Sequence, residues 1–221
     1  MSAAVPPESS DPPPFPPFEV DSTERIYDSY WCGLRRDMVR LPDGELQEYH
    51  VFEIHDAVAV VPVLPDGSIV MLWQLRHPHG LTHWEVPAGR VDEGESAEEA
   101  ARRELLEETG YRAGRLEELP GFYPTNGISP HHARLFVAHD CERVEEPRPD
   151  PSERFLVRVH PREEVQRRLL RGDYADGFTA LALFHHFARD RTVSGTNPPP
   201  ARDRTVSGTN PPPAQGRLRP Q

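Results

Sequence analysis

The stretch GRVDEGESAEEAARRELLEETGY, at residues 89–111, carries the strongest structural signal in this chain of 221 residues. Ser96 is a favourable N-cap residue, and Glu99 three positions later completes the pattern of a capping box. The residues that follow are strong helix formers, and Gly110 suits the left-handed conformation that often ends a helix. The stretch therefore predicts a glycine-led loop followed by a helix over residues 97–109.

Three glutamates share one face of this predicted helix. Glu104, Glu107 and Glu108 are spaced i, i+3 and i+4, so their carboxylates fall within an arc of about 100°. Clustered carboxylates repel one another unless they share a cation, and hard oxygen ligands suit Mg²⁺ or Mn²⁺. Arg103 lies one turn before Glu107 and is expected to pair with it. The glutamates alone also fit a solvated face, but the loop, cap and closing glycine in register predict a metal site.

The spacing of the whole stretch resembles the Nudix box, the signature of the Nudix hydrolases. Every fixed position is filled, by Gly89, Glu95, Arg103, Glu104, Leu105, Glu107, Glu108, Gly110 and Tyr111. The resemblance implies an α/β (α+β) fold, a Nudix-type α/β/α sandwich with a mixed sheet and an N-terminal antiparallel hairpin. It also implies hydrolysis of a pyrophosphate bond with Mg²⁺ or Mn²⁺ as cofactor.

The pattern around the box predicts strands and two more helices. Pro-Asp-Gly turns predict a hairpin of 30–41 with 45–54 and a second hairpin of 57–64 with 68–76. Hydrophobic periodicity predicts further strands at 116–123, 133–138 and 155–160, and helices at 162–170 and 177–189. A mixed sheet with helices on both faces is the expected architecture.

Both ends of the chain differ in composition from the middle. Residues 1–20 are rich in proline and lack periodicity, which predicts a disordered leader. The sequence ARDRTVSGTNPPP occurs at 188–200 and again at 201–213, and a repeat of this composition cannot bury a core. We therefore predict one Nudix hydrolase domain over residues 21–189, followed by a disordered tail at 190–221.

The composition and net charge indicate which binding partners and which cellular compartment to expect. A net charge of −11 argues against broad contact with nucleic acid or an anionic membrane. The sequence has no long apolar run and no signal-peptide pattern. Cys32 and Cys141 are far apart and lack metal-type spacing, so free thiols in a reducing compartment are expected. The sequence therefore predicts a cytoplasmic protein that acts on a small nucleotide.

Two short motifs before the box indicate which branch of the Nudix hydrolases the chain resembles. QLR at 74–76 and WEVPAG at 84–89 are similar to the ADP-ribose and nucleoside-diphosphate-sugar pyrophosphatase branch of the Nudix hydrolases. In that branch the implied metal ligands are the carbonyl of Ala88 and the carboxylates of Glu104, Glu107 and Glu108. The same resemblance implies that Arg76 points at the substrate phosphates, and it places Glu85 in the substrate site. Arg76 also fits an ordinary surface position.

Aromatic residues of the N-terminal strands are candidates for stacking on a base. Branch members commonly exchange these strands, so the resemblance implies a homodimer in which Tyr30 or Trp31 reaches the partner's nucleotide. Tyr30 and Trp31 also fit plain core or edge positions.

The loop at 124–132 departs from the ADP-ribose pattern. Asn126 stands where ADP-ribose members carry a proline, and His131 aligns with a loop glutamate that acts as a metal ligand or base. His131 or His132 is a candidate base because histidine titrates near neutral pH, although adjacent loop histidines are often simply exposed. Glu153 is another candidate base. We therefore expect a broad preference among nucleoside diphosphate sugars, with ADP-ribose accepted but not sharply favoured over GDP-mannose or ADP-glucose.

Three functions are compatible with the box. The first is Mg²⁺-dependent hydrolysis of a nucleoside diphosphate sugar to a nucleoside monophosphate and a sugar phosphate. The second is a non-catalytic module that senses a nucleotide; such a module is expected to lose box carboxylates, and none is missing here. The third is pyrophosphohydrolysis of an RNA 5′ end or a nucleoside triphosphate, and the acidic charge fits RNA poorly.

Overall fold

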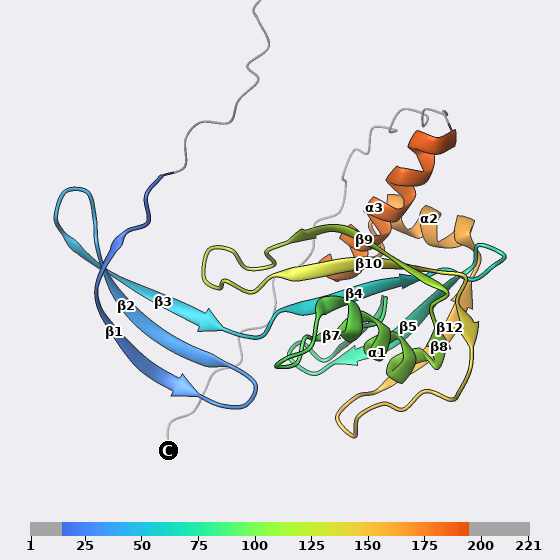
Figure 1. Ribbon diagram of the computed structural model, residues 1–221, viewed down its shortest axis with the longest axis horizontal. Coiled ribbons are helices and arrows are strands. Elements are labelled where there is room, and N and C mark those ends of the chain that lie inside the picture. The colour runs from blue at the N-terminus through green and yellow to red at the C-terminus, as the bar shows by residue number, and fades with distance from the viewer. Residues whose placement is uncertain (1–14, 195–221) are drawn as a thin grey trace, which may run out of the picture.

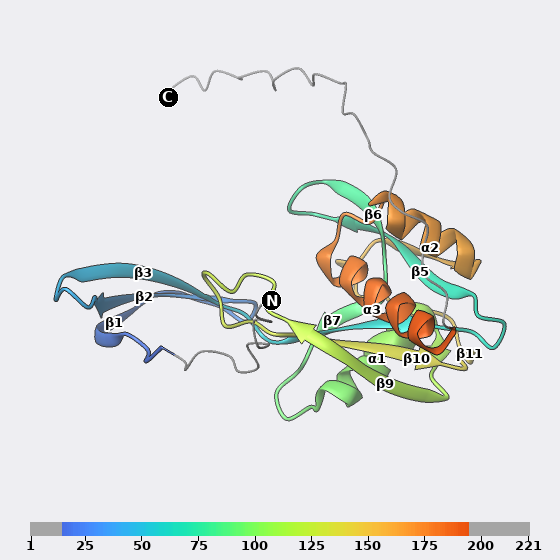
Figure 2. The same ribbon diagram turned by 90° about the horizontal axis from the view of Figure 1, so that it is seen from above.

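A computed structural model describes the backbone of residues 15–194 and the side chains of residues 15–189. Within this range a three-stranded N-terminal sheet projects from a larger α/β part (Figures 1 and 2). Two predicted boundaries are corrected: the first strand begins at Glu19, inside the leader predicted for residues 1–20, and the last described helix continues to Ser194, inside the tail predicted for 190–221. Residues 1–14 of that leader and 195–221 of that tail lie outside the described residues. Within residues 15–194, no helix is both long and apolar enough to cross a membrane.

The N-terminal sheet is antiparallel, with β2 (Gly33–Arg40) between β1 (Glu19–Asp28) and β3 (Leu46–Glu53). The predicted hairpin of β2 with β3 is confirmed, and its turn places Gly44 at φ 89°, where glycine is favoured. Sequence patterns did not predict β1. All of its residues are exposed, so pairing with β2 stabilises this strand without the burial that would create a recognisable alternation.

The central sheet has the strand order β7-β4-β10-β9. β4 (Ala57–Pro62) pairs in parallel with β10 (Ala133–His139). At the two edges, β7 (Ala88–Arg90) is antiparallel to β4, and β9 (Arg115–Phe122) is antiparallel to β10. β4 is buried on both faces: Val58 and Val60 pack toward α1 (Ala97–Thr109), and Ala59 and Val61 pack toward α3 (Gly177–Ser194). Burial on two faces explains its near-continuous apolar sequence. The predicted α/β/α sandwich with a mixed sheet is confirmed.

A second sheet, of order β12-β5-β6, corrects one prediction. Its strands are β12 (Phe155–His160), β5 (Ile69–Arg76) and β6 (Leu81–Glu85), and α2 (Arg162–Arg171) follows β12. The predicted hairpin of 57–64 with 68–76 is wrong beyond its turn: only Val63 and Ile69 bridge, and the strands then diverge. They diverge because both ladder edges of β4 are taken by β7 and β10. Two short strands, β8 (Tyr111–Arg112) and β11 (Glu142–Arg143), also pair.

Candidate active site

The helix of the predicted metal site, α1, begins and ends as its sequence predicts. The Ser96 side chain accepts a hydrogen bond from the Glu99 amide, and the Glu99 carboxylate accepts one from the Ser96 amide, so both halves of the capping box are present. Gly110 closes the helix at φ 74°. These two ends fix the register of the helix, and with it the positions of the three glutamates.

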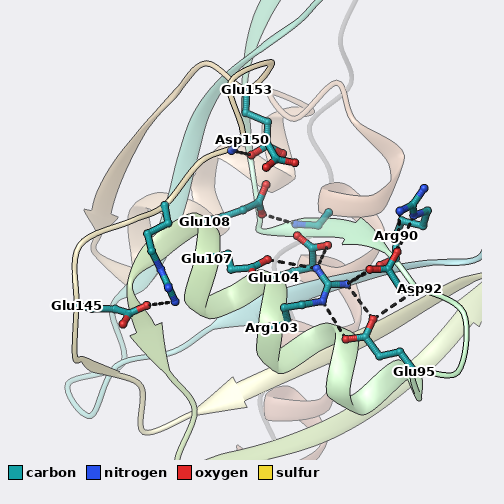
Figure 3. Close-up of polar contacts among 12 residues, drawn as sticks. Arg90, Asp92, Glu95, Arg103, Glu104, Glu107, Glu108, Glu145, Asp150 and Glu153 are labelled. Carbon is teal, nitrogen blue, oxygen red and sulfur yellow. Dashed lines mark hydrogen bonds and ion pairs between the residues drawn. The ribbon is translucent and has the colours of Figure 1, made fainter. Parts of the chain in front are cut away.

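Arg103 connects the helix to the glycine-led loop before it (Figure 3). Its guanidinium donates to Glu95 through Nε and Nη2, both at 2.9 Å, and to the carbonyl of Arg90 at 2.9 Å. Its Nη1 donates to Glu104 at 2.7 Å and to Glu107 at 3.3 Å. The predicted Arg103–Glu107 pair is present, but it is one contact of several. Arg103 therefore holds three box carboxylates and the loop in one arrangement.

Gly89 lies directly against the Glu104 carboxylate. A Cβ atom at this position would come within 2.0 Å of Glu104 Oε1, far closer than atoms can pack. Glycine at position 89 therefore permits the close approach of the loop to the helix. This contact gives a physical reason for the glycine that opens the stretch.

Glu108 is buried with half of its hydrogen-bonding capacity unused. Its side chain is 2% exposed, its Oε2 accepts from the Ala88 amide at 2.9 Å, and its Oε1 has no partner among the described residues. Burial raises the pKa of Glu108 well above its usual range, and the neighbouring charge of Glu104 adds to the effect. An orphaned carboxylate oxygen in such a place requires an explanation, and a bound cation is one.

The donor set around Glu108 fits a divalent cation. Burial also raises the pKa of Glu104, and the negative charge of Glu153 acts on both Glu104 and Glu108. Figure 3 shows Glu153, from the loop before β12, beside Glu108. As they stand in the described part of the chain, no three acidic, histidine or cysteine side chains are arranged to enclose a metal ion. The uncompensated negative charge and hard oxygen donors nevertheless match Mg²⁺ or Mn²⁺.

A pocket of about 460 Å³ opens beside the box loop and includes Ala88 and Gly89 in its lining. Arg76 also lines it and donates to both carboxylate oxygens of the buried Glu85, with Nη2–Oε2 at 2.5 Å and Nε–Oε1 at 3.2 Å. Burial acts to lower the pKa of Arg76, but the hydrogen bond to Glu85 and the negative charges of Glu85, Glu108 and Asp176 together outweigh burial and raise it. Arg76 is thus a permanently charged guanidinium held in a fixed orientation at the pocket.

Two predicted residues of the 124–132 loop do not line this pocket. His131 is buried, and its Nδ1 lies 2.6 Å from the carbonyl oxygen of His55. Asn126 is exposed, and its loop is tied to β3 by a hydrogen bond from the Phe52 amide to the Ile128 carbonyl. The structure brings Glu153 to the carboxylates and leaves Asn126 and His131 outside the pocket lining.

The two candidate stacking residues also lie outside the pocket. Tyr30 and Trp31 are 68% and 71% exposed, and their rings lie 4.5 and 5.9 Å from the guanidinium carbon of Arg90. Arg90 Nη2 also hydrogen-bonds to the Tyr30 hydroxyl. Within one chain, these aromatics therefore contact the box loop through Arg90.

Sequence reasoning missed four other residues that line the pocket: His79, His83, Asp176 and Phe178. His79 lies in the turn between β5 and β6, His83 lies in β6, and Asp176 precedes a predicted helix as an N-cap would. These local patterns can be recognised in the sequence, but nothing in the sequence spacing indicates that residue 176 lies near residue 76.

Comparisons with known proteins agree with this architecture. The model of the NUDIX domain matches residues 53–182, and that of the nucleoside diphosphate sugar hydrolase N-terminal domain matches residues 18–52. The chain is 35% identical to an ADP-ribose pyrophosphatase of Mycobacterium tuberculosis, over 75% of this chain and 81% of the relative. An ADP-ribose pyrophosphatase of Bacillus subtilis is also 35% identical, over 72% of this chain and 87% of its own.

A more distant relative and a solved structure extend the comparison. The ADP-sugar pyrophosphatase of Mus musculus is 30% identical, over 68% of this chain and 76% of the relative. A crystal structure of an ADP compounds hydrolase superposes with a TM-score of 0.71 over 83% of this chain and 99% of that one. Its sequence identity is 21%, so this likeness supports the fold.

Proposed function

This chain belongs to the Nudix family, and on that premise we propose that it hydrolyses the pyrophosphate bond of a nucleoside diphosphate sugar, using Mg²⁺, to a nucleoside monophosphate and a sugar phosphate. Two ADP-ribose pyrophosphatases and an ADP-sugar pyrophosphatase match 68% to 75% of its length, and the N-terminal match is to a nucleoside diphosphate sugar hydrolase domain. The observation that carries the proposal is the orphaned, buried oxygen of Glu108, next to a pocket that presents Arg76.

The residues proposed to hold the metal are Glu104 and Glu108, with Glu107 and the carbonyl of Ala88 beside them. Glu104 and Glu108 have pKa values raised by burial, so a cation would offset the cost of keeping them charged. When bound, Mg²⁺ would neutralise phosphate charge and lower the pKa of the attacking water. Arg103 contributes indirectly, because it holds Glu104 and Glu107 in place.

We assign the remaining roles to side chains that face the same space. Arg76 binds phosphate oxygens, and the buried Glu85 fixes the orientation of its guanidinium. Glu153 is the proposed proton acceptor, because its charge acts on Glu104 and Glu108 and its Oε2 is oriented by the Asp150 amide at 2.9 Å. His131, another of the predicted candidates, is engaged with the His55 carbonyl.

We further propose that the enzyme is a homodimer. The N-terminal sheet exposes large apolar side chains on β1 and β3, namely Val20, Ile26, Tyr27, Leu46, Tyr49 and Phe52. A second copy packed on one face of this sheet would bury the side chains of that face and bring Tyr30 and Trp31 toward the partner's nucleotide. A fully active monomer at micromolar concentration, by light scattering, would overturn this assignment.

A cytoplasmic location is proposed from the thiols. Cys32 and Cys141 are both free, and burial raises the pKa of Cys141 to about 12, so this thiol is inert at neutral pH. Retention of the intact native protein in the cytosolic fraction after cell fractionation is the expected result, and recovery outside it would contradict the assignment.

The experiment that tests the substrate class is a panel of kcat/KM values with Mg²⁺. It compares ADP-ribose, ADP-glucose and GDP-mannose with dinucleotides, nucleoside triphosphates and triphosphorylated RNA. We expect the sugar nucleotides to be cut best, with ADP-ribose not favoured by more than about a hundredfold. Faster release of pyrophosphate from RNA would instead support RNA 5′-end hydrolysis. Tight ADP-ribose binding without product over hours would support a sensor.

A further inference from the structure

We propose that His79, His83 and Asp176 form a subsite that recognises a pair of sugar hydroxyls on the substrate. This inference rests on the proposed function, because it assigns part of a sugar nucleotide to the same pocket that holds Arg76. The three residues come from the loop after β5, from β6, and from the segment before α3, and all of them line the pocket. Asp176 is near enough for its charge to act on Arg76, so the subsite adjoins the proposed phosphate position.

Asp176 presents a fixed acceptor to this pocket. Its Oδ2 accepts a hydrogen bond from the Thr179 amide at 2.8 Å, and its carbonyl accepts one from the Ala180 amide at 3.0 Å. Asp176 is therefore the N-cap of α3, and that role holds its carboxylate in place. No described residue donates to its other oxygen, Oδ1, and the side chain is half-buried. An oriented carboxylate oxygen is thus left for a ligand hydroxyl.

The two histidines add imidazole edges to this acceptor. Their rings pack edge to face with centroids 4.9 Å apart and an interplanar angle of 74°. The Leu81 amide donates to His79 Nδ1 at 3.3 Å, so a neutral His79 carries its proton on Nε2 and can donate there. Within the described part of the chain, neither ring nitrogen of His83 has a hydrogen-bond partner.

This combination suits hydroxyls better than it suits a base. Each hydroxyl of a vicinal pair both donates and accepts, so a carboxylate with adjacent imidazole edges can satisfy both groups. A base would need flat apolar faces on which to stack. The only such ring in the pocket lining is Phe178, and it is already packed against Phe122 with an interplanar angle of 68°.

The vicinal hydroxyls can belong to the nucleoside ribose or to the second sugar, and the test distinguishes the two. The first variant is Asp176→Asn, because asparagine also caps helices. Its amide oxygen can replace Oδ2 toward Thr179, which leaves an NH₂ donor where the acceptor was. Asp66→Asn is the matched control: Asp66 also accepts from a backbone amide, that of Ser68 at 2.9 Å, but it does not line the pocket.

Asp176→Asn could lower activity by weakening the helix cap, so a second variant tests the subsite at a residue that does not cap α3. His83→Phe keeps a ring that can pack on His79 but removes both ring nitrogens. Each variant is assayed on ADP-ribose, on an analogue whose nucleoside ribose lacks both hydroxyls, and on ADP methyl ester, which has no second sugar. Thermal melting confirms that each variant is folded.

Asp176→Asn is expected to lower kcat/KM on ADP-ribose by about tenfold or more, since a hydrogen bond to a charged group is lost. His83→Phe should lower it in the same direction, and Asp66→Asn should stay within about twofold of the wild type. The loss should vanish on the analogue that lacks the recognised hydroxyls, which identifies the sugar. An equal loss on all three substrates, or no loss on ADP-ribose, would overturn the inference. No turnover of any substrate by the wild type would refute the proposed function, and the inference with it.

Discussion

The box helix and the N-terminal sheet both carry many charges, but they use them differently. Around α1 the charged groups turn inward: Arg103 contacts three carboxylates and a carbonyl, and Glu108 is buried. In the N-terminal sheet Arg35 pairs with Asp37 and Glu53, yet most side chains of β1 and β3 remain exposed on both faces. The first region is closed around the proposed metal site. The second offers a surface, which explains why we assign chemistry to one and assembly to the other.

The largest expected effect is on the closed region. Glu108→Gln should lower kcat by at least about a thousandfold, because the substitution removes the charge proposed to hold the metal. The fold should persist, since the shape and the hydrogen bond from Ala88 are retained. The matched control is Glu98→Gln, on the exposed side of the same helix, where only an ion pair with Arg102 is lost. Steady-state assays with saturating Mg²⁺ measure both, and wild-type-like turnover by Glu108→Gln would contradict the site.

A second substitution tests whether the loop must approach the helix closely. Gly89→Ala places a methyl group against the Glu104 carboxylate, whose flexible end must then move. We expect kcat to fall by about tenfold to a hundredfold, because small misplacement of a catalytic group has effects of this size. The melting temperature should change little, since the obstructing group is a side-chain end and not backbone. A large loss of stability with normal specific activity would contradict this explanation.

These two regions also differ in how far their sequence predicts them. The box helix, its caps and the Arg103–Glu107 pair follow from spacings of three or four residues, so local pattern is sufficient for them. The contacts of Arg103 with Glu95 and with the Arg90 carbonyl, 8 and 13 residues away, were not predicted. β1 has no burial pattern, and the separation of β4 from β5 depends on which distant strands occupy the ladder edges of β4. The position of Asp176 near Arg76 likewise depends on the tertiary fold. Residue chemistry was therefore predictable at the box, and the family resemblance pointed to Arg76 and Glu85 in the pocket lining, whereas His79, His83 and Asp176 were not predicted.

Substitutions that introduce charged side chains on β3 test whether the N-terminal sheet forms the dimer interface. Leu46 and Tyr49 are exposed, three residues apart, and so lie on opposite faces of the sheet. They face Arg40 and Asp37 across the ladder, so Leu46→Glu and Tyr49→Lys each gain a complementary partner within the sheet. At least one should weaken dimerisation by about tenfold, measured by sedimentation, with the monomer still folded. Leu170→Glu, at an exposed position on α2, is the control and should leave the dimer unchanged.

Lowering the pH should destabilise the same N-terminal sheet, with a smaller effect than the substitutions above. Burial acts to raise the pKa of Asp37, but hydrogen bonds from Arg35 and Thr23 outweigh burial and lower it. A depressed pKa in the folded state gives stability that is present above the ordinary pKa of 3.8 and is lost as the pH falls through the lowered value. We therefore expect amide exchange in β1 and β2 to accelerate below about pH 4 in the wild type. The acid dependence should be weaker in Asp37→Asn, and an identical dependence in that variant would exclude this carboxylate as its source.

The central claim is that the carboxylates of α1 and the pocket at Arg76 together cleave a pyrophosphate bond with a divalent cation. The most direct test incubates the chelator-treated wild-type protein with ADP-ribose and follows the products by chromatography as Mg²⁺ is added. The account predicts no cleavage in chelator, and equimolar AMP and ribose 5-phosphate once Mg²⁺ is restored. Cleavage that continues undiminished in excess chelator, or no AMP at any Mg²⁺ or Mn²⁺ concentration, would contradict it.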